Sequence, residues 1–349
     1  MKETHRIELP RIVLVGAGVL NDLGEICIEL GFKRALIVSG RKTFKVAGER
    51  AVEILKRSGL EVEATSALKA DLDTVHRVAG EASSMGAEVV IGVGGGRVID
   101  VAKMAAARSH IEFISAPTTA SHDGIASSLA SIKGLGRPYS VKAVAPIAVV
   151  ADSEVIASAP YRLTASGCGD VIAKVVAVRD WRLAHEVNGE YYGEYAASLA
   201  LMSSNLVMRS SELIREGEEE GIRTLIEALV SCGVAMSIAG SSRPCSGSEH
   251  LFSHALDLIA PRPALHGEQC GVGTIMMAKL HGLNWMEIRE RLRAVGAPTT
   301  AEELGIEPRY IVEALVRARW IRPGRYTILN EVKLTSEEAK SLAEECGVI

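Results

Sequence analysis

The chain has 349 residues, of which 48% are hydrophobic and 23% charged, and its 39 basic and 43 acidic residues leave a net charge of -4. This balance, without a long basic run, argues against nucleic-acid binding, and no apolar run approaches the ~18 residues that an integral membrane helix needs. The charged start MKETHRIELPR is unlike a secretory signal, and six scattered cysteines without a CxxC pair fit a reducing cytoplasm.

The first part of the chain alternates strand-like and helix-like segments. Apolar or alternating runs predict strands at residues 12–18, 34–40, 60–65, 87–96, 111–117 and 145–152. Amphipathic patterns between them predict helices at 21–31, 43–58, 71–85 and 97–108. Such alternation predicts an α/β domain with a parallel, Rossmann-like sheet covered by helices.

After Asp152 the pattern becomes mostly helical. Helices are predicted at 160–186, 191–215, 221–239 and 249–259, and Thr335 with Glu338 forms a capping box for a last helix. We therefore expect two domains, residues 1–153 and 154–349, with a cleft between them where ligand sites tend to form.

Two glycine motifs occur in the α/β part. The segment GAGVLN at 16–21 begins like a dinucleotide fingerprint but has Asn21 where the third glycine belongs, which makes it a weak match. Gly94, Gly95 and Gly96 come directly after one predicted strand and before a predicted helix. Backbone N–H groups and a helix N-terminus at such a turn favour a phosphate, so we predict pyrophosphate binding there.

Two neighbouring loops bear on the cofactor. The loop PTTASHDG at 117–124 offers hydroxyl groups for a nucleotide and a carboxylate, Asp123, although such residues also serve as plain helix caps. After the strand at 34–40 come Arg41 and Lys42 and no acid that would repel a 2′-phosphate, so NADPH is expected to be accepted as well as NADH. A solvated basic turn is the alternative interpretation.

Three of the nine histidines lie in the stretch 246–269, SGSEHLFSHALDLIAPRPALHGEQ. His250 and His254 are four residues apart, so on a helix both rings leave the same face, and His266 follows a proline-broken turn. A catalytic divalent metal takes imidazole and carboxylate ligands with one position left open. The residues leave open which two histidines bind, or whether all three are ordinary polar residues, and a carboxylate must come from elsewhere.

Several segments together resemble the sn-glycerol-1-phosphate dehydrogenases of archaeal type. This family belongs to the larger group of glycerol dehydrogenase, iron-containing alcohol dehydrogenases and dehydroquinate synthase. The likeness runs in order through most of the chain: GGGRVIDVAK at 94–103, PTTASHDGIAS at 117–127, APYRLTASGCGD at 159–170, SGSEHLFSHALD at 246–257, HGEQCGVGT at 266–274, GAPTTAEELGI at 296–306 and IRPGRYTIL at 321–329.

The resemblance implies a metal site formed by Asp170, His250 and His266, which would hold one Zn²⁺ per subunit, with Fe, Ni or Co as alternatives. It implies that Asp123, Asp170 and His254 contact substrate and take part in catalysis. The cofactor contacts that it implies are Gly94, Gly95, Gly96, Arg97, Val98, Ile99, Asp100, Thr118, Thr119, Ala120, Ser121 and Ser127.

The implied reaction is the NAD(P)H-linked reduction of dihydroxyacetone phosphate to sn-glycerol 1-phosphate, the backbone of ether phospholipids. Lys133, Arg137 and Arg162 are candidate phosphate partners. A polyol dehydrogenase shares every feature except the phosphate partner. A dehydroquinate synthase-like lyase would have a site richer in lysine and arginine, and a structural metal would need four closed ligands. Apolar helices in the second domain predict a homo-oligomer.

Overall fold

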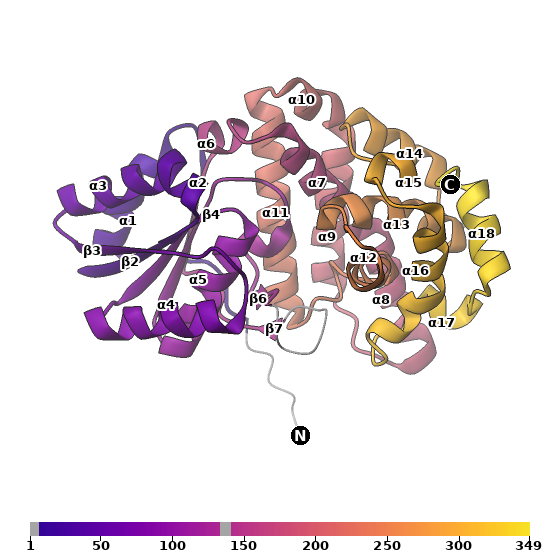
Figure 1. Ribbon diagram of the computed structural model, residues 1–349, viewed down its shortest axis with the longest axis horizontal. Coiled ribbons are helices and arrows are strands. Elements are labelled where there is room, and N and C mark those ends of the chain that lie inside the picture. Colours follow the sequence, from indigo (N-terminus) through magenta and orange to yellow (C-terminus); the bar gives the residue numbers. More distant parts are fainter. Residues whose placement is uncertain (1–6, 133–140) are drawn as a thin grey trace. The chain divides into compact units, whose positions relative to one another are not determined.

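The computed structural model describes residues 7–132 and 141–349, and the chain divides into two compact units, Met1–Pro160 and Tyr161–Ile349 (Figure 1). The sequence placed the division between 153 and 154. The helix α6 (Ser153–Ala157) belongs to the first unit because it packs against the strands β1 and β8. Asp152, the last residue of β8, caps α6 by accepting hydrogen bonds from the N–H groups of Glu154 and Val155.

The first unit contains a six-stranded sheet in which every pair of neighbouring strands is parallel. The strand order is β1-β8-β5-β4-β2-β3, with register pairs such as Ala35 with Val89 and Val89 with Glu112. The predicted parallel α/β sheet is therefore confirmed. The strands are β1 (Ile12–Gly16), β2 (Arg34–Ser39), β3 (Glu61–Ser66), β4 (Val89–Gly94), β5 (Glu112–Pro117) and β8 (Ala148–Asp152).

Helices cover both faces of this sheet, as Figure 1 shows. Alternate strand residues point to opposite faces, so Ile91 joins one hydrophobic cluster with α1 (Leu23–Glu29) and α3 (Glu49–Arg57). Val90 joins the cluster on the other face with α4 (Leu72–Met85) and α5 (Gly96–Ser109). The central strands are apolar on both faces because both faces are buried.

Some short elements differ from the sequence prediction. The segment predicted as one helix at 43–58 is α2 (Arg41–Thr43), a π-helical stretch η2 (Phe44–Gly48) and α3. A Cβ at Gly48 would lie 2.6 Å from Phe44 Cδ2, so glycine lets the Phe44 ring pack against the backbone there. The sequence also did not predict the 3-10 turns η1 (Val19–Asp22) and η3 (Asp123–Ile125), or the small antiparallel pair β6 (Leu129–Ala130) and β7 (Val141–Lys142).

The second unit is helical in its described elements. The predicted helix at 160–186 is two helices that meet at Ala173, and the one at 191–215 is broken at Ser210. The capping box of Thr335 and Glu338 begins the last helix as predicted. The helices are α7 (Tyr161–Ile172), α8 (Lys174–Asn188), α9 (Glu194–Arg209), α10 (Ser211–Glu216), α11 (Glu219–Ala239), α12 (Ser248–Ile259), α13 (His266–Leu280), α14 (Trp285–Ala294), α15 (Ala301–Leu304), α16 (Pro308–Ile321), α17 (Ile328–Val332) and α18 (Ser336–Glu345).

Two glycines bring α7 and α13 close together. A Cβ at Gly169 would overlap the carbonyl oxygen of Gly267, and a Cβ at Gly267 would overlap the carbonyl oxygen of Ser166. The two backbones therefore approach more closely than any larger residue would allow. Gly169 precedes Asp170 and Gly267 follows His266 in the sequence, so this close approach sets where both functional candidates lie.

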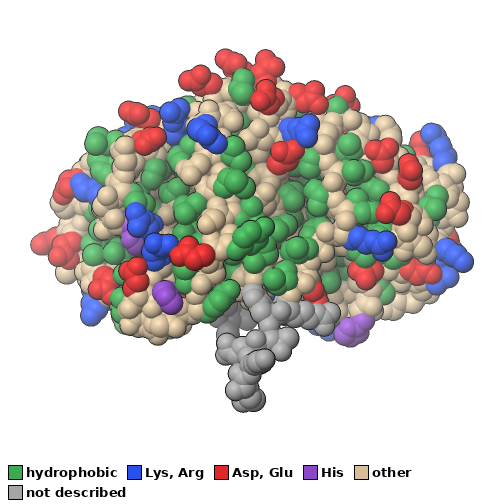
Figure 2. Space-filling view, turned by 180° about the vertical axis from the view of Figure 1, so that it is seen from behind, with side chains coloured by type: hydrophobic (Ala, Val, Ile, Leu, Met, Phe, Trp, Pro, Cys, Tyr) green, Lys and Arg blue, Asp and Glu red, His purple; other side chains and the backbone are tan. Residues whose placement is uncertain are grey.

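One helix among the described residues, α11, is long and apolar enough to span a membrane. In the structure 67% of its apolar window is buried, and it packs along α9 and against α7. The burial is that of a core helix, so its length and composition are weak evidence for a membrane span. On the face shown in Figure 2, Lys and Arg side chains are scattered among Asp and Glu, without a continuous basic patch.

Candidate metal centre and cofactor loop

The predicted glycine turn lies at the carboxyl end of β4, where ligands bind in parallel sheets of this kind. The chain leaves β2 toward β3 on one side, while β4 lies on the other side of β2, so the topology switches between β2 and β4. Ligands bind outside the carboxyl ends of the strands at such a switch point. The loop after β2 also reaches the start of α5, because a Cβ at Gly40 would lie 3.6 Å from Val98 Cγ2.

Gly94, Gly95 and Gly96 need to be small because of close contacts rather than unusual backbone angles. A Cβ at Gly94 would lie 2.7 Å from Val98 Cβ, and one at Gly96 would overlap the ring of His122. Gly95 is the N-cap of α5 and has no side chain to accept hydrogen bonds from the first amides of the helix. Those amides and the positive end of the helix dipole suit an anion such as a pyrophosphate.

The threonine loop adjoins the glycine turn. The N–H of Thr118 donates to the carbonyl oxygen of Gly94 at 3.0 Å, and Thr119 Oγ1 lies 3.3 Å from Ser121 Oγ. The hydroxyl of Thr118 is buried and has no hydrogen-bond partner among the described residues. An unpartnered buried hydroxyl costs free energy, so the loop fits a polar ligand that would bond it. Ala120 is buried beside it.

Asp100 and Lys103 connect α5 to the segment that carries Asp123 and Ser127. Lys103 Nζ is fully buried and donates to the carbonyl oxygens of Gly124 (2.6 Å) and Leu129 (2.7 Å). Burial lowers the pKa of Lys103 to about 8, although Asp100 and Asp123 oppose this shift. Asp100 accepts from the N–H of Ser131 at 3.1 Å, and burial raises its pKa.

The remaining cofactor candidates contribute differently. Val98 and Ile99 are core side chains of α5, so only their backbone atoms suit a phosphate, whereas the guanidinium of Arg97 donates to the carbonyl oxygen of Leu68. Ser127 is buried, and its hydroxyl bonds the backbone of Leu129. Sequence reasoning missed Lys103, although a lysine on the apolar face of a predicted helix was a signal that could have found it.

The weak motif at 16–21 has its amides satisfied within the chain. Asp152 accepts hydrogen bonds from the N–H groups of Gly18 (3.1 Å) and Leu20 (3.2 Å). A carboxylate therefore already occupies the place that a phosphate would take in a dinucleotide fingerprint. This geometry supports assigning the phosphate to Gly94–Gly96 rather than to this turn.

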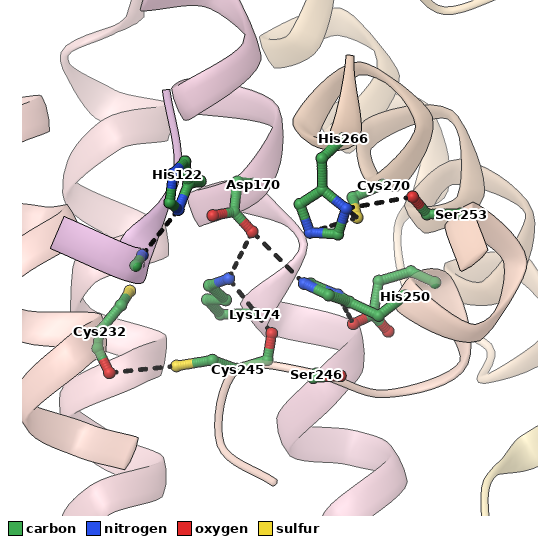
Figure 3. Close-up of polar contacts among 12 residues, drawn as sticks. His122, Asp170, Lys174, Cys232, Cys245, Ser246, His250, Ser253, His266 and Cys270 are labelled. Atoms are coloured by element: carbon green, nitrogen blue, oxygen red, sulfur yellow. Dashed lines mark hydrogen bonds and ion pairs between the residues drawn. The ribbon is translucent and has the colours of Figure 1, made fainter. Parts of the chain in front are cut away.

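The three implied metal ligands lie together in the second unit, on three helices. Asp170 is on the last turn of α7, His250 on the first turn of α12, and His266 begins α13 (Figure 3). His250 Nε2 lies 3.5 Å from Asp170 Oδ1, and the rings of His250 and His266 are 4.9 Å apart between centroids. Asp170 and His250 are buried, and His266 is half-buried.

A fourth donor, Cys270, lies one turn after His266 on α13. Its Sγ is 3.6 Å from His266 Nε2. The three potential ligand atoms of His250, His266 and Cys270 all lie within 4.8 Å of one another. Two imidazoles, a carboxylate and a thiol suit a divalent transition metal, with zinc prominent among those that accept such a set. The residues present therefore fit a metal, and sequence reasoning missed Cys270 because a single cysteine carried no pattern.

Supporting carboxylates and hydroxyls hold the two imidazoles. Glu249 Oε1 accepts from the backbone N–H of Gly247 and lies 2.7 Å from His250 Nδ1, which leaves Nε2 facing Asp170. Ser253 Oγ lies 3.2 Å from His266 Nδ1. Metal-binding histidines commonly bond such a partner through their other nitrogen, which orients the ring and sets its tautomer.

Electrostatics in the centre follow from burial and close pairing. Burial raises the pKa of Asp170, but Lys174 and His250 together lower it by more. The pKa of Asp170 therefore lies well below the usual range of a carboxyl group. Burial lowers the pKa of His250, yet Cys270, Asp170 and Glu249 together raise it well above the usual value. Burial, with His250, lowers the pKa of His266 to about 3, so its imidazole is neutral as metal binding requires.

Lys174 is a second buried group that the sequence analysis did not use. It lies one turn after Asp170, at the start of α8, and its Nζ is 2.7 Å from Asp170 Oδ1 and 3.2 Å from the carbonyl oxygen of Cys245 (Figure 3). The i, i+4 spacing of an acid and a base was a visible signal for this pair. The ammonium holds the carboxylate in one orientation.

His254 is placed beside the ligand pair. Its ring stacks on His266, with centroids 5.7 Å apart, while it lies 6.5 Å from His250. His254 Nδ1 is 3.7 Å from Asp257 Oδ2, and burial lowers the pKa of His254, which favours the neutral ring. The sequence spacing put His250 and His254 on one helix face; the fold makes His266 the nearer neighbour of both.

Of the three basic residues predicted as phosphate partners, the structure describes only Arg162. Lys133 and Arg137 lie outside the described residues. Arg162 is on the first turn of α7, and its guanidinium bonds both carboxylate oxygens of Glu268, at 2.6 and 2.7 Å. Its side chain is 63% exposed, so it is a surface ion pair.

Comparison with known proteins gives consistent results. A family model described as iron-containing alcohol dehydrogenase matches residues 14–160. The chain is 55% identical to a glycerol-1-phosphate dehydrogenase [NAD(P)+] of Methanosarcina acetivorans over 98% of this chain and 96% of that protein. It is 53% identical to the protein of that name from Pyrococcus furiosus, over 99% and 100% of the two chains.

Solved structures show the same fold at much lower sequence identity. A probable glycerol dehydrogenase from Sinorhizobium meliloti aligns with a TM-score of 0.79 at 23% identity, covering 98% of both chains. A glycerol dehydrogenase from Schizosaccharomyces pombe aligns with a TM-score of 0.82 at 21% identity, covering 99% of this chain and 91% of that one. These likenesses confirm the expected fold class of an α/β unit followed by a mostly helical one.

Proposed function

The chain belongs to the glycerol-1-phosphate dehydrogenase family, and on this premise we propose that it reduces dihydroxyacetone phosphate to sn-glycerol 1-phosphate with NAD(P)H. The observation that carries the proposal is the donor set of Asp170, His250 and His266, gathered on three helices of the second unit. The product supplies the glycerophosphate backbone of ether phospholipids. The enzyme is an oxidoreductase that acts on a CH–OH group.

We assign the cofactor to the carboxyl end of β4. The amides of Gly94, Gly95 and Gly96 would bind the pyrophosphate at the start of α5, and the hydroxyl of Thr118 would gain the hydrogen-bond partner that it lacks. The cofactor contacts Arg97, Val98, Ile99, Asp100, Thr119, Ala120, Ser121 and Ser127 complete the assignment. The basic turn of Arg41 and Lys42, at the first turn after β2, supports acceptance of NADPH as well as NADH.

We assign one divalent metal to Asp170, His250 and His266. The two imidazoles and one carboxylate of this site favour zinc. When bound, it supplies Lewis-acid stabilisation of the negative charge that develops on the substrate's C2 oxygen as hydride arrives from the nicotinamide. Glu249 fixes the His250 ring so that Nε2 faces this position, and the buried Lys174 fixes the Asp170 carboxylate.

His254 and Asp123 are the proposed substrate residues besides Asp170. The neutral His254 ring, with Nδ1 toward Asp257, keeps Nε2 available to orient the terminal hydroxyl or to relay a proton to the new alkoxide. Asp123 lies in the first unit on the segment that Lys103 anchors, and it would accept a hydrogen bond from a substrate hydroxyl.

We further propose a cytoplasmic homo-oligomer. Large apolar side chains on α9, α10 and α14 are exposed, among them Met202, Leu213 and Met286, and their contact with a second copy of the chain would remove them from water. Sedimentation of the purified protein tests this part of the proposal separately.

The decisive experiment is NADPH oxidation by the purified protein with dihydroxyacetone phosphate, before and after metal removal, with analysis of the product enantiomer. Metal-dependent formation of sn-glycerol 1-phosphate is the expected result. Glycerol oxidation with NAD⁺ and no reaction with dihydroxyacetone phosphate would instead indicate a polyol dehydrogenase. Restoring the stripped enzyme with zinc, iron, nickel or cobalt identifies the effective metals.

A further inference from the structure

Two arginines of the second unit bond one serine, Ser242, and a third arginine follows this serine in the sequence. Arg243 lies in the segment between α11 and α12, and Arg322 and Arg325 lie between α16 and α17. Ser242 Oγ accepts from Arg325 Nη2 at 2.8 Å and from Arg322 Nη1 at 3.4 Å. The segments at 242–246 and 322–325 are about 80 residues apart in the sequence but meet here.

Arg325 is a buried cation whose hydrogen bonds go to neutral oxygens, the carbonyl of Ser246 and the hydroxyl of Ser242. Arg243 and Arg325 are only 3% and 4% exposed. Arg243 pairs with Glu190 and bonds both of its carboxylate oxygens. The other acid that acts on Arg325 is Glu249. Glu249 already accepts a hydrogen bond from the N–H of Gly247 and lies against His250. Burial, followed by the repulsion of Arg322 and Arg243, lowers the pKa of Arg325 to about 9.

A buried guanidinium such as that of Arg325 costs free energy unless an anion offsets its charge. Buried charges in proteins are paired, and like charges placed together disfavour their ionised forms. Arginine clusters are also the usual partners of phosphate groups, because the planar guanidinium bonds two oxygens at once. Arg325 donates one hydrogen bond from each terminal nitrogen, to Ser246 and Ser242, and each of these nitrogens carries a second N–H.

The cluster also adjoins the substrate side of the metal centre. Arg325 bonds the carbonyl oxygen of Ser246, two residues before the start of α12, the helix that carries both His250 and His254. Arg325 therefore holds the segment that leads into the helix of the histidine assigned to the substrate.

From this juxtaposition we infer that Arg325 and Arg322 form the subsite that binds the phosphate of a phosphorylated three-carbon substrate. The inference rests on the proposed function and deepens it, because it names residues that separate dihydroxyacetone phosphate from unphosphorylated dihydroxyacetone. Arg243 acts as a positioning residue: its pairing with Glu190 and its bond to the carbonyl oxygen of Tyr326 hold the two segments together.

The test compares two substrates in Arg325→Met, Arg325→Lys and Arg322→Met. We expect kcat/KM for dihydroxyacetone phosphate to fall about 10- to 100-fold in the methionine variants, the range for losing a hydrogen bond to a charged group. For dihydroxyacetone, kcat/KM should stay unchanged in these variants. The kcat/KM of Arg325→Lys for dihydroxyacetone phosphate should lie between those of wild type and Arg325→Met. Arg223→Met is the matched control, since Arg223 is an exposed arginine on α11 paired with Glu227.

Inorganic phosphate provides a second readout. It should inhibit the wild-type enzyme competitively with dihydroxyacetone phosphate, and the inhibition constant should rise in Arg325→Met by the same factor as the loss in kcat/KM. An equal loss with both substrates, or unchanged phosphate inhibition in a folded variant, would overturn the inference. Arg322→Met, in which a half-buried residue changes, keeps the test valid if Arg325→Met does not fold.

Failure of the proposed function would be visible separately. If the wild-type protein reduces neither sugar, calorimetry with inorganic phosphate alone still tests the subsite. Binding to wild type that weakens at least about tenfold in Arg325→Met, as expected for a charge-assisted hydrogen bond, would support the subsite. Absence of binding, or equal binding to both proteins, would refute it.

Discussion

The candidate cofactor loop and the candidate metal centre are built in opposite ways. The loop consists of three consecutive glycines whose backbone amides face the start of α5. The metal centre draws Asp170, His250 and His266 from three helices, and its ligands are charged or titratable side chains in a buried place. A backbone site tolerates few changes of shape, whereas a side-chain site depends on charges and on the groups that orient them.

Among the described residues, two buried lysines show the same contrast. Lys103, in the first unit, binds two carbonyl oxygens and lies 4.0 Å from Asp100, so its charge is weakly paired. Lys174, in the second unit, lies 2.7 Å from Asp170. Lys103 therefore serves mainly to anchor a loop, and Lys174 to hold a carboxylate. Changes in either unit should leave the ligand of the other unit bound, and the following predictions test that independence.

The largest effect is expected from Asp170→Ala. Loss of the carboxylate removes a metal ligand and leaves the Lys174 ammonium buried without its partner, which costs on the order of 3–5 kcal/mol in unfolding free energy. We expect metal content, measured by elemental analysis, and turnover to be lost, while NADPH binding persists. The double variant Asp170→Ala/Lys174→Met should recover stability but not metal. Normal turnover in metal-free Asp170→Ala would refute the metal assignment.

A smaller loss is expected from Glu249→Gln. The amide keeps the shape of Glu249 but removes the charge beside His250 Nδ1, so metal affinity should fall by about 10- to 100-fold, as for other groups that support a metal ligand. Competition with a chromophoric chelator measures this affinity. Glu227→Gln, on the exposed side of α11, is the matched control. Equal affinity in Glu249→Gln and wild type would show that Glu249 does not orient the ligand.

Gly94→Ala should affect the other unit alone. The new Cβ would lie 2.7 Å from Val98 Cβ and push the first turn of α5 away from β4, an overpacking that costs about 1–3 kcal/mol. We expect the dissociation constant for NADPH, followed by cofactor fluorescence, to rise roughly 10-fold or more with metal content unchanged. Loss of metal in this variant would show that the two sites are not independent.

The control for Gly94→Ala is Gly80→Ala on α4, where a new Cβ meets no atom within 4 Å. Removing a glycine from a helix interior should raise the unfolding free energy by about 0.5–1 kcal/mol, measured by urea denaturation, and leave NADPH binding intact. Weaker NADPH binding in Gly80→Ala would mean that the Gly94 effect is not specific to the loop.

Lys103 makes the stability of the protein depend on pH, without a direct effect on either ligand. Its pKa is lowered to about 8 in the folded protein, from 10.5, so the unfolded chain binds more protons between these values. The contribution of Lys103 to stability is therefore least favourable below pH 8 and rises with pH toward 10.5. Relative to Lys103→Met, wild type should gain on the order of 2 kcal/mol between pH 7 and 10 in urea unfolding. If the difference in unfolding free energy between wild type and Lys103→Met did not change with pH, the pKa of Lys103 would not be lowered in the folded protein.

Local patterns in the sequence predicted much of the fold. The alternation of apolar strands and amphipathic helices predicted the parallel sheet, because strands buried on both faces, such as Val89–Gly94, are apolar throughout. The turn at Gly94 was predicted from its place between strand and helix. Errors occurred where local pattern is ambiguous: the helix break at Ala173, the π-helical stretch Phe44–Gly48 and the short pair of β6 and β7.

The candidate site was predictable only in part. His250 and His254 share a helix, so their spacing was informative, but the choice of Asp170 and His266 came from family resemblance. Cys270 and the arginine cluster carried no recognisable spacing. The amides at 16–21 resembled a phosphate site in sequence, and only the structure shows Asp152 bound to them.

The sequence by itself determined the elements, the glycine turn and the residue types available for chemistry, because these depend on neighbours a few positions apart. The tertiary structure decided which distant residues meet. Gly169 and Gly267 let α7 and α13 touch, which brings Asp170 toward His266, and the segments around Ser242 and Arg325 close into one cluster. Such contacts depend on how whole helices pack, and no pattern of neighbouring residues in the sequence encodes that packing.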